Sequence, residues 1–175
     1  MPTSDKSPAS SFLGFITAAY FCCFIGSEGA FQGISGWYLI IQRPAWAPGP
    51  VLLEPLWLLL YGMAGVAIYQ AFRQERAPKV AVIVISSVLL ELSALWDWLF
   101  FAWHLLVPAL ILGILLWLTM LGWVGWLLKL RISAGLLALP LLCWFCYASA
   151  LNMAVWRLNS GPQTAPTLVP SSPVP

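Results

Sequence analysis

Three carboxylates after residue 50 of this sequence lie inside long apolar runs, where an ionised side chain is hard to accommodate. Glu54 stands near the start of one run, and Glu91 and Asp97 share another. Ionisable groups in such positions usually face the interior of a helix bundle or a wet cavity, so all three are candidates for function. Glu91 is the deepest, and we expect it to be a buried carboxyl. Glu54 and Asp97 lie nearer to helix ends, where solvation at an interface is an alternative to a role in a pocket.

The sequence contains four cysteines, Cys22, Cys23, Cys143 and Cys146, and one histidine, His104. A structural zinc site needs four nitrogen or sulfur ligands in a closed cluster, and His104 lies far from the cysteines in sequence. Cys143 and Cys146 have the C-x-x-C spacing without the βαβ context of a redox motif, so we expect buried thiols, and we expect His104 in a loop. No nucleophile–base pair is apparent either. The sequence therefore predicts no metal site, no cofactor and no ordinary hydrolytic or metal-dependent catalysis.

The amino-acid composition differs from that of soluble and of disordered proteins. Of the 175 residues, 61% are apolar and 8% are charged, whereas soluble domains average about 45–50% apolar and about 25% charged residues. A chain with 11 tryptophans also has too much apolar surface for a disordered protein. The net charge is +2, without a dense cluster of cations, which argues against nucleic acid as a partner.

Five stretches are long enough and apolar enough to cross a bilayer, which takes about 20 residues per helix. They are apolar on every side, unlike the short alternating strands of a membrane barrel. We therefore expect an all-α, multi-pass integral membrane protein with a bundle of five transmembrane helices, in a membrane that the sequence does not identify. The expected spans are 12–34, 51–72, 80–103, 105–128 and 132–156. They form a domain 12–159 between an N-terminal segment 1–11 and a tail 160–175. This tail is rich in Pro, Ser and Thr, and we expect it to be disordered.

The cations divide unevenly between the two ends of these spans. Cytoplasmic loops carry an excess of Lys and Arg, so the end with more cations is expected to face the cytoplasm or an equivalent compartment. One side holds Arg43 and Arg157, and the other holds Lys6, Arg73, Arg76, Lys79, Lys129 and Arg131.

The segment 35–50 differs from the other connections because it is long and rich in aromatic residues and proline. It contains Trp37, Tyr38, Arg43, Pro44 and Trp46. Long loops with their own aromatic side chains tend to be functional, which favours a lid over the bundle. An interfacial aromatic belt is the alternative, because Trp and Tyr populate membrane interfaces in any case.

Two of the expected spans carry a stripe of polar and aromatic residues at helical spacing. Facing stripes can form hydrogen bonds between helices, which explains them by packing alone. The functional alternative is an apolar cavity with aromatic walls and a few polar groups that orient a ligand. The stripes are Ser93, Trp96, Asp97 and Phe100 in the third span, and Ser149, Asn152, Met153 and Trp156 in the fifth.

Gly29 and Gly33 in the first span have the small-x-x-x-small spacing that lets helices approach closely. This pair could mark the seam of a dimer. Packing within one chain and relaxation of the helix near its end are equal alternatives.

Several of these segments resemble the translocator protein family, also called tryptophan-rich sensory proteins. Trp37-Tyr38, Arg43-Pro44-Ala45-Trp46-Ala47-Pro48, Pro55-Leu56-Trp57 and Tyr61 are similar to its W-Y…[KR]-P-x-W-x-P…P-V-W…L-Y pattern. Leu99-Phe100-Phe101 after Trp96 and the ending Leu151-Asn152…Trp156…Asn159 are similar to two further elements of the family. The resemblance covers about residues 12 to 159.

The resemblance implies one ligand cavity within a five-helix bundle, closed by the loop between the first two helices. It implies a membrane receptor or carrier for planar hydrophobic small molecules, above all tetrapyrroles such as protoporphyrin IX and haem, with sterols and benzodiazepine-type drugs as further ligands. It also implies contact with membrane lipid and a homodimer. The ligand-binding residues it implies, together with the stripes, are Trp37, Tyr38, Arg43, Pro44, Trp46, Leu53, Trp57, Tyr61, Ser93, Trp96, Phe100, Trp144, Ala148, Leu151 and Asn152.

An alternative activity that the resemblance implies is degradation of porphyrin with light and oxygen, for which Trp57 and Trp144 are the catalytic candidates. The sterol-recognition pattern of the family is incomplete in this chain. It places a tyrosine between an aliphatic residue and an arginine, and here Met153 stands in that position before Arg157. We therefore expect weaker sterol binding than tetrapyrrole binding.

Overall fold

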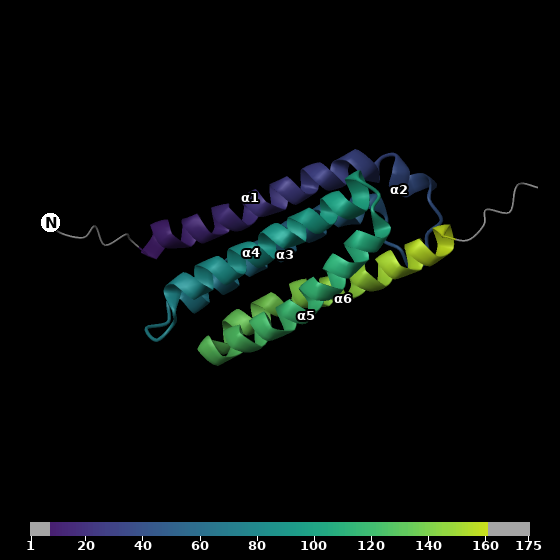
Figure 1. The fold of residues 1–175 in the computed structure, drawn as a ribbon. Coiled ribbons are helices and arrows are strands. Elements are labelled where there is room, and N and C mark those ends of the chain that lie inside the picture. The colour runs from purple at the N-terminus through teal and green to yellow at the C-terminus, as the bar shows by residue number, and fades with distance from the viewer. Residues whose placement is uncertain (1–7, 161–175) are drawn as a thin grey trace, which may run out of the picture.

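The computed structural model describes residues 8–160 and consists of helices joined by short connections (Figure 1). The long helices are α1 (Pro8–Ile34), α3 (Pro50–Phe72), α4 (Lys79–Asp97), α5 (Leu106–Leu130) and α6 (Ile132–Asn159). A short helix α2 (Trp37–Ile40) lies in the first connection, and a π-helical turn η1 (Trp98–Ala102) continues α4. Five segments are long and apolar enough to cross a membrane, which confirms the expected all-α membrane bundle.

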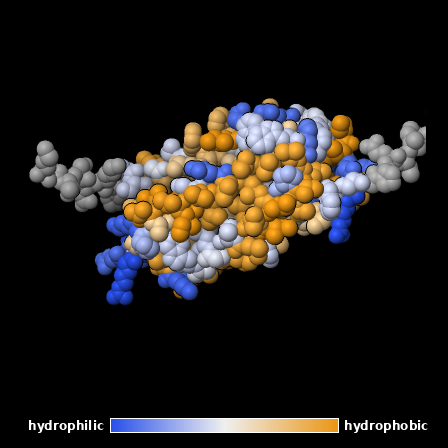
Figure 2. Space-filling view, viewed as in Figure 1, coloured by the Kyte–Doolittle hydropathy of each residue, from blue (hydrophilic) through white to orange (hydrophobic). Residues whose placement is uncertain are grey.

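The surface has the distribution that a bilayer requires. Figure 2 shows hydrophobic side chains over the middle of the molecule and most of the strongly hydrophilic ones near its two ends. The chain is therefore a multi-pass integral membrane protein. The tail 161–175 and the first seven residues lie outside the described residues, so the expected disorder of the tail stays a prediction.

Backbone chemistry accounts for where the helices begin and end. Pro50 occupies the first turn of α3, where a missing N–H costs nothing, and Gly49 precedes it in an extended conformation. Arg131 alone separates α5 from α6, with extended angles of φ −159° and ψ 125°. A Cβ at Gly135 would overlap Leu128, so glycine is needed where the two antiparallel helices leave this turn. The helices α5 and α6 therefore form a tight hairpin.

The helix α1 packs against α3, α4 and η1, and three of its glycines face α4 and η1. A Cβ at Gly29 would lie 2.6 Å from Cγ of Trp98, and one at Gly33 would overlap the carbonyl group of Phe101. Gly26 meets α4 in the same way, because its Cβ would lie 2.6 Å from Oδ2 of Asp97. Of the alternatives for Gly29 and Gly33, the structure therefore shows packing within one chain.

The end of the third span departs from a regular α-helix. Trp98 to Ala102 form a π-turn, closed by a 2.9 Å hydrogen bond from the Trp103 N–H to the Trp98 carbonyl. The chain then reverses at His104, which has a left-handed φ of 55°. His104 thus lies in the connection to α5, as expected. Phe100 and Phe101 of this turn are both buried.

Two expectations about buried groups are wrong. Glu91 is exposed on the outside of the bundle, and Asp97, at 5% exposure, is the buried carboxyl of α4. Cys143 and Cys146 are also exposed, on α6, while Cys23 is buried and Cys22 half-buried. Both errors have one cause: a helix that is apolar on all sides does not reveal which face meets lipid and which meets protein.

Candidate functional site

The loop between α1 and α3 covers one end of the bundle with its aromatic side chains. Trp37 stacks on His104 at 4.4 Å between ring centroids and meets the edge of Phe100 at 5.5 Å. Tyr38 is fully buried against Phe101, also at 5.5 Å. These rings pack on the ends of the transmembrane helices, an arrangement that fits the lid interpretation better than a free interfacial belt.

Hydrogen bonds fasten the same loop to α6. The Asn159 side chain accepts from the Gln42 N–H at 3.2 Å and donates to the Gln42 carbonyl at 2.9 Å. The Tyr147 hydroxyl donates to the Trp46 carbonyl at 2.9 Å, and the rings of Trp46 and Tyr147 meet edge to face at 5.5 Å. The loop is thus attached to the last helix at two points. Tyr147 and Asn159 were not among the expected site residues, although Asn159 belongs to the family-like ending of the sequence.

Arg43 contacts the ring of Tyr38 within the same loop. Its guanidinium carbon lies 4.5 Å from the centre of the Tyr38 ring, while the Tyr38 hydroxyl donates to the Pro48 carbonyl at 3.1 Å. Burial raises the pKa of Tyr38, and the neighbouring Arg43 opposes this shift. The tyrosine is therefore neutral at physiological pH, and the arginine keeps its positive charge beside it.

A second arginine lies near Arg43 at this end of the bundle. A hollow of about 560 Å³ lies between the loop and the end of α6. Its walls include Arg43 and Pro44 from the loop and Met153, Ala154 and Arg157 from α6. Within residues 8–160 neither arginine forms an ion pair, so both charges can meet an anion. The hollow combines an apolar floor with two cations.

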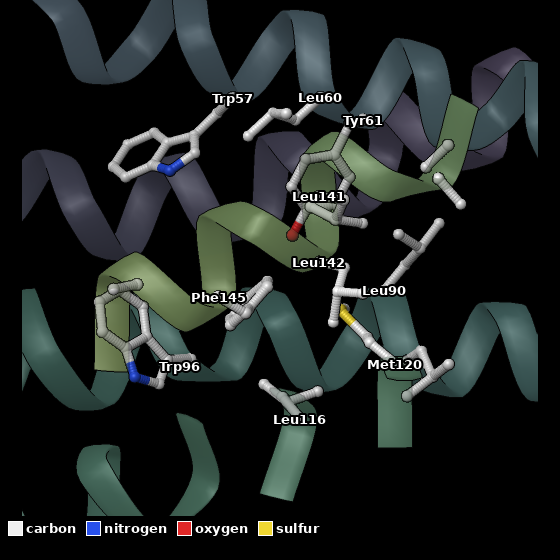
Figure 3. Packing of buried hydrophobic residues seen from close by; sticks show 14 of the residues in the cluster. Trp57, Leu60, Tyr61, Leu90, Trp96, Leu116, Met120, Leu141, Leu142 and Phe145 are labelled. Atoms are coloured by element: carbon white, nitrogen blue, oxygen red, sulfur yellow. The ribbon is translucent and has the colours of Figure 1, made fainter. Parts of the chain in front are cut away.

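An aromatic core fills the bundle beneath the loop (Figure 3). Trp96 is 1% exposed and stacks on Phe100 at 5.0 Å with 9° between the ring planes. Trp57 meets the edge of Phe101 at 5.9 Å, and Phe145 of α6 meets the edge of Trp96 at 6.2 Å. The side chains expected to form the walls of a cavity therefore pack against one another in this structure.

Three polar atoms in this core have no hydrogen-bond partner among the described residues. They are the indole nitrogens of Trp57 and Trp96 and the hydroxyl oxygen of Tyr61. Trp96 Nε1 points toward α5 and α6, because a Cβ built on Gly113 would lie 3.1 Å from it and 2.9 Å from the Ser149 hydroxyl. A buried donor left unpaired costs about 1–3 kcal/mol. Three of them together call for an explanation.

Other expected polar residues already have partners in the backbone. Ser93 donates to the Leu89 carbonyl of its own helix at 2.7 Å. Asn152 is fully buried, and in the orientation that satisfies its amide it donates to the Leu106 carbonyl at 3.0 Å and accepts from the Leu110 N–H at 2.9 Å. These two side chains join and shape the walls. Leu53, Ala148 and Leu151 are buried around the same core.

The two tryptophans singled out for redox chemistry lie in different ring clusters. Trp57 is buried against Phe101, whereas Trp144 is half-buried and tilted over Tyr147 at 5.4 Å, and Tyr147 in turn meets Trp46 of the loop. The helices that carry them, α3 and α6, are packed together. Trp57 thus belongs to the core and Trp144 to the ring cluster that meets the loop.

Among residues 8–160, no group of three or more His, Cys, Asp or Glu side chains is placed so that it could hold a metal ion. The buried carboxyl of α4, Asp97, lies against Gly26 of α1, where a Cβ would come within 2.6 Å of its Oδ2 atom. The end of the bundle at the loop thus offers aromatic faces, unpaired donors and a hollow lined by two arginines.

Most of the chain matches known proteins in sequence. The model of the TspO/MBR family matches residues 15–157. The chain is 31% identical over 154 residues to Protein CrtK of Rhodobacter capsulatus, covering 82% of this chain and 92% of that protein. It is 30% identical over 157 residues to the Translocator protein of Homo sapiens, covering 85% and 90%. A third relative is the Tryptophan-rich protein TspO of Archaeoglobus fulgidus, at 31% over 137 residues, covering 78% and 89%.

Proposed function

Since the chain belongs to the TspO/MBR family, we propose that it is a membrane receptor or carrier that binds a tetrapyrrole beneath the 35–49 loop. Names such as Translocator protein and Tryptophan-rich sensory protein among its relatives support a receptor or sensor role in a membrane. Residues of this chain support the ligand class and its site.

The observation that carries the proposal is the set of three unpaired donors in the aromatic core. Trp57, Tyr61 and Trp96 bury an N–H or O–H group without a partner, at a cost that folding alone does not explain. A ligand with acceptor atoms would satisfy these groups and recover that cost on binding. The imine-type ring nitrogens of a metal-free porphyrin are acceptors of this kind, and its carboxylates remain free to meet the rim. The surrounding ring faces suit the apolar macrocycle.

The rim of the site supports an anionic ligand. Arg43 and Arg157 face a hollow with an apolar floor, and guanidinium groups bind carboxylates in a bidentate manner. A flat molecule with two carboxylates on one edge would place its charge at this rim and its ring system under the loop. A sterol has no such charge, which agrees with the incomplete sterol pattern around Met153.

Entry would require the loop to move. The core is packed in this structure, and the loop is held to α6 by the bonds from Tyr147 and Asn159. Bonds of this kind contribute about 0.5–1.5 kcal/mol each, so detaching the loop from α6 at these two points has a modest cost. The binding residues we propose are therefore the loop residues Trp37, Tyr38, Arg43, Pro44 and Trp46, together with Leu53, Trp57, Tyr61, Ser93, Trp96, Phe100, Trp144, Ala148, Leu151 and Asn152.

The homodimer that the family resemblance implies stays a prediction. Gly29 and Gly33 are occupied by contacts with Trp98 and Phe101 of the same chain. A dimer seam would therefore lie on another surface of the bundle.

The proposal is tested by titrating the purified, detergent-solubilised protein with protoporphyrin IX, haem and cholesterol and following tryptophan fluorescence. We expect saturable quenching by protoporphyrin IX or haem, and we expect that excess cholesterol, which does not itself quench tryptophan, displaces the bound porphyrin only weakly. The double variant Arg43→Gln, Arg157→Gln should bind porphyrin about tenfold more weakly, which corresponds to about 1.4 kcal/mol. The control Arg76→Gln removes an exposed arginine at the opposite end and should bind like the wild type. Quenching that does not saturate, or equal affinity for cholesterol, would refute the proposal.

A further inference from the structure

An outer groove between α1 and α4 carries a carboxylate that the proposed site does not use. Glu91 lies 12 residues after Lys79 in a span that runs from Lys79 to Ala102, which places it near the centre of the membrane, about 18 Å from the start of the helix. Its side chain is exposed on the outside of the bundle. Within residues 8–160 it has no ion pair and no hydrogen bond. A carboxylate in such surroundings is costly unless it is paired.

The groove beside Glu91 has a defined shape. A hollow of about 330 Å³ lies there, with walls formed by Cys22 and Ile25 of α1 and by Glu91, Leu95, Trp98 and Trp103. Apart from the carboxylate, these walls are almost entirely apolar. A small ligand could therefore place a polar head at Glu91 and a hydrocarbon body along the helices.

Two indoles form the other end of this hollow, and one of them is firmly held. Trp98 donates from Nε1 to the Ile25 carbonyl at 2.8 Å and lies against Gly29. Its ring is tilted against that of Trp103 at 5.9 Å between centroids. Aromatic faces near a carboxylate attract cations, because the ring quadrupole and the negative charge both favour a positive group.

Charge complementarity decides between the possible occupants. The cations of the described spans, such as Lys79 and Lys129, lie near the helix ends, so a second copy of this chain would bring no cation to the depth of Glu91. A neutral lipid tail would leave the carboxylate unpaired. A protonated amine on a hydrocarbon body would pair with Glu91 and contact the indoles.

We propose that this outer groove is a binding site for a lipophilic amine, with Glu91 as the partner of the ammonium group and Trp98 and Trp103 as its aromatic wall. The site is separate from the proposed tetrapyrrole site, which lies inside the bundle beneath the loop. Ligands of the two sites therefore differ in charge as well as in place.

The experiment uses 11-bromoundecylamine as the probe, because bromine quenches nearby indoles, with the full-length protein in phosphatidylcholine nanodiscs. We expect saturable quenching by the amine and only a linear partitioning response to 11-bromoundecanol. Glu91→Gln keeps the shape of the side chain and should raise the half-saturating amine concentration at least about tenfold. Glu54→Gln removes another exposed carboxylate, on α3, and should leave it unchanged.

Equal quenching by the amine in the wild type and in Glu91→Gln would overturn the proposal, as would saturable quenching by the alcohol. A change of oligomeric state in Glu91→Gln on size-exclusion chromatography, without any dependence on the amine, would show that a second copy covers the groove and would also overturn it. Protoporphyrin binding should be the same in both proteins. The proposed function and this proposal can thus fail independently.

Discussion

The two ends of the bundle bury similar groups but satisfy them differently. At the end opposite the loop, Trp123 donates from Nε1 to the Ser86 hydroxyl at 3.0 Å, and Ser133 connects Gln70 to Arg131. At the end beneath the loop, Trp57 and Trp96 are as deeply buried as Trp123, yet their indole nitrogens have no partner among the described residues. Equally buried indole donors are therefore satisfied at one end and unpaired at the other. The satisfied end stabilises the fold, and we assign the unsatisfied end to the ligand.

The largest expected effect comes from removing the partner at the satisfied end. Ser86→Ala leaves the Trp123 N–H buried and unpaired, so the free energy of unfolding should fall by about 1–3 kcal/mol. Thermal unfolding in detergent would show a lower transition temperature than for the wild type. Porphyrin affinity should not change, because Ser86 is remote from the loop. A weaker porphyrin affinity in a Ser86→Ala protein that is still folded would show that this end of the bundle also affects ligand binding, contrary to our assignment.

The next effect concerns the attachment of the loop to α6. Asn159→Ala removes both hydrogen bonds to the Gln42 peptide group, so bound porphyrin should dissociate about fivefold faster, equivalent to about 1 kcal/mol. Stopped-flow displacement would measure this rate. The bonds are exposed to solvent, which limits their value, and unfolding should be little affected. An unchanged dissociation rate would show that the loop does not retain the ligand.

A smaller effect is expected for the second attachment point. Tyr147→Phe removes the single hydrogen bond to the Trp46 carbonyl but keeps the ring that Trp46 and Trp144 contact. Dissociation should accelerate by about twofold to threefold, less than in Asn159→Ala. The same displacement assay compares the two variants directly. Faster dissociation from Tyr147→Phe than from Asn159→Ala would mean that the Tyr147 hydrogen bond contributes more than the Asn159 bonds to the attachment of the loop.

The smallest expected difference separates Trp57 from Trp144. If a bound porphyrin is bleached by light in the presence of oxygen, an indole in the core should matter more than one under the loop. Trp57→Phe should therefore slow the light-dependent loss of porphyrin absorbance by about twofold relative to Trp144→Phe, with porphyrin binding in both variants kept within about tenfold. Bleaching in the wild type that is no faster than in empty detergent would remove the degrading activity from consideration.

Much of the architecture was predictable from the sequence, for a physical reason. A helix that crosses a bilayer must be long and apolar, so hydropathy alone locates the five spans. The aromatic residues of the first connection, such as Trp37 and Tyr38, also identify the loop that covers the bundle. The spacing of Gly29 and Gly33 predicts a close approach between helices, although not between which ones.

The inward faces of the helices could not be predicted in the same way. Lipid and protein core are both apolar, so the periodicity that marks the buried face of a soluble helix is weak here. Glu91 and Asp97 are six positions apart on one helix, yet the first faces outward and the second inward. The contacts of Tyr147 and Asn159 with the loop join residues more than 100 positions apart, which no local pattern reveals.

The most direct test of the central claim measures porphyrin affinity in three single variants, Trp57→Phe, Trp96→Phe and Trp123→Phe. Each variant removes one buried indole N–H and keeps most of the aromatic face. If the unpaired donors are reserved for the ligand, Trp57→Phe and Trp96→Phe should raise the dissociation constant by about threefold to tenfold. They should lower stability less than Trp123→Phe, because all three variants leave a similar cavity but only Trp123→Phe also loses a hydrogen bond. Trp123→Phe should lower stability and leave the dissociation constant unchanged. Equal affinities in all three variants, or a loss confined to Trp123→Phe, would contradict the account.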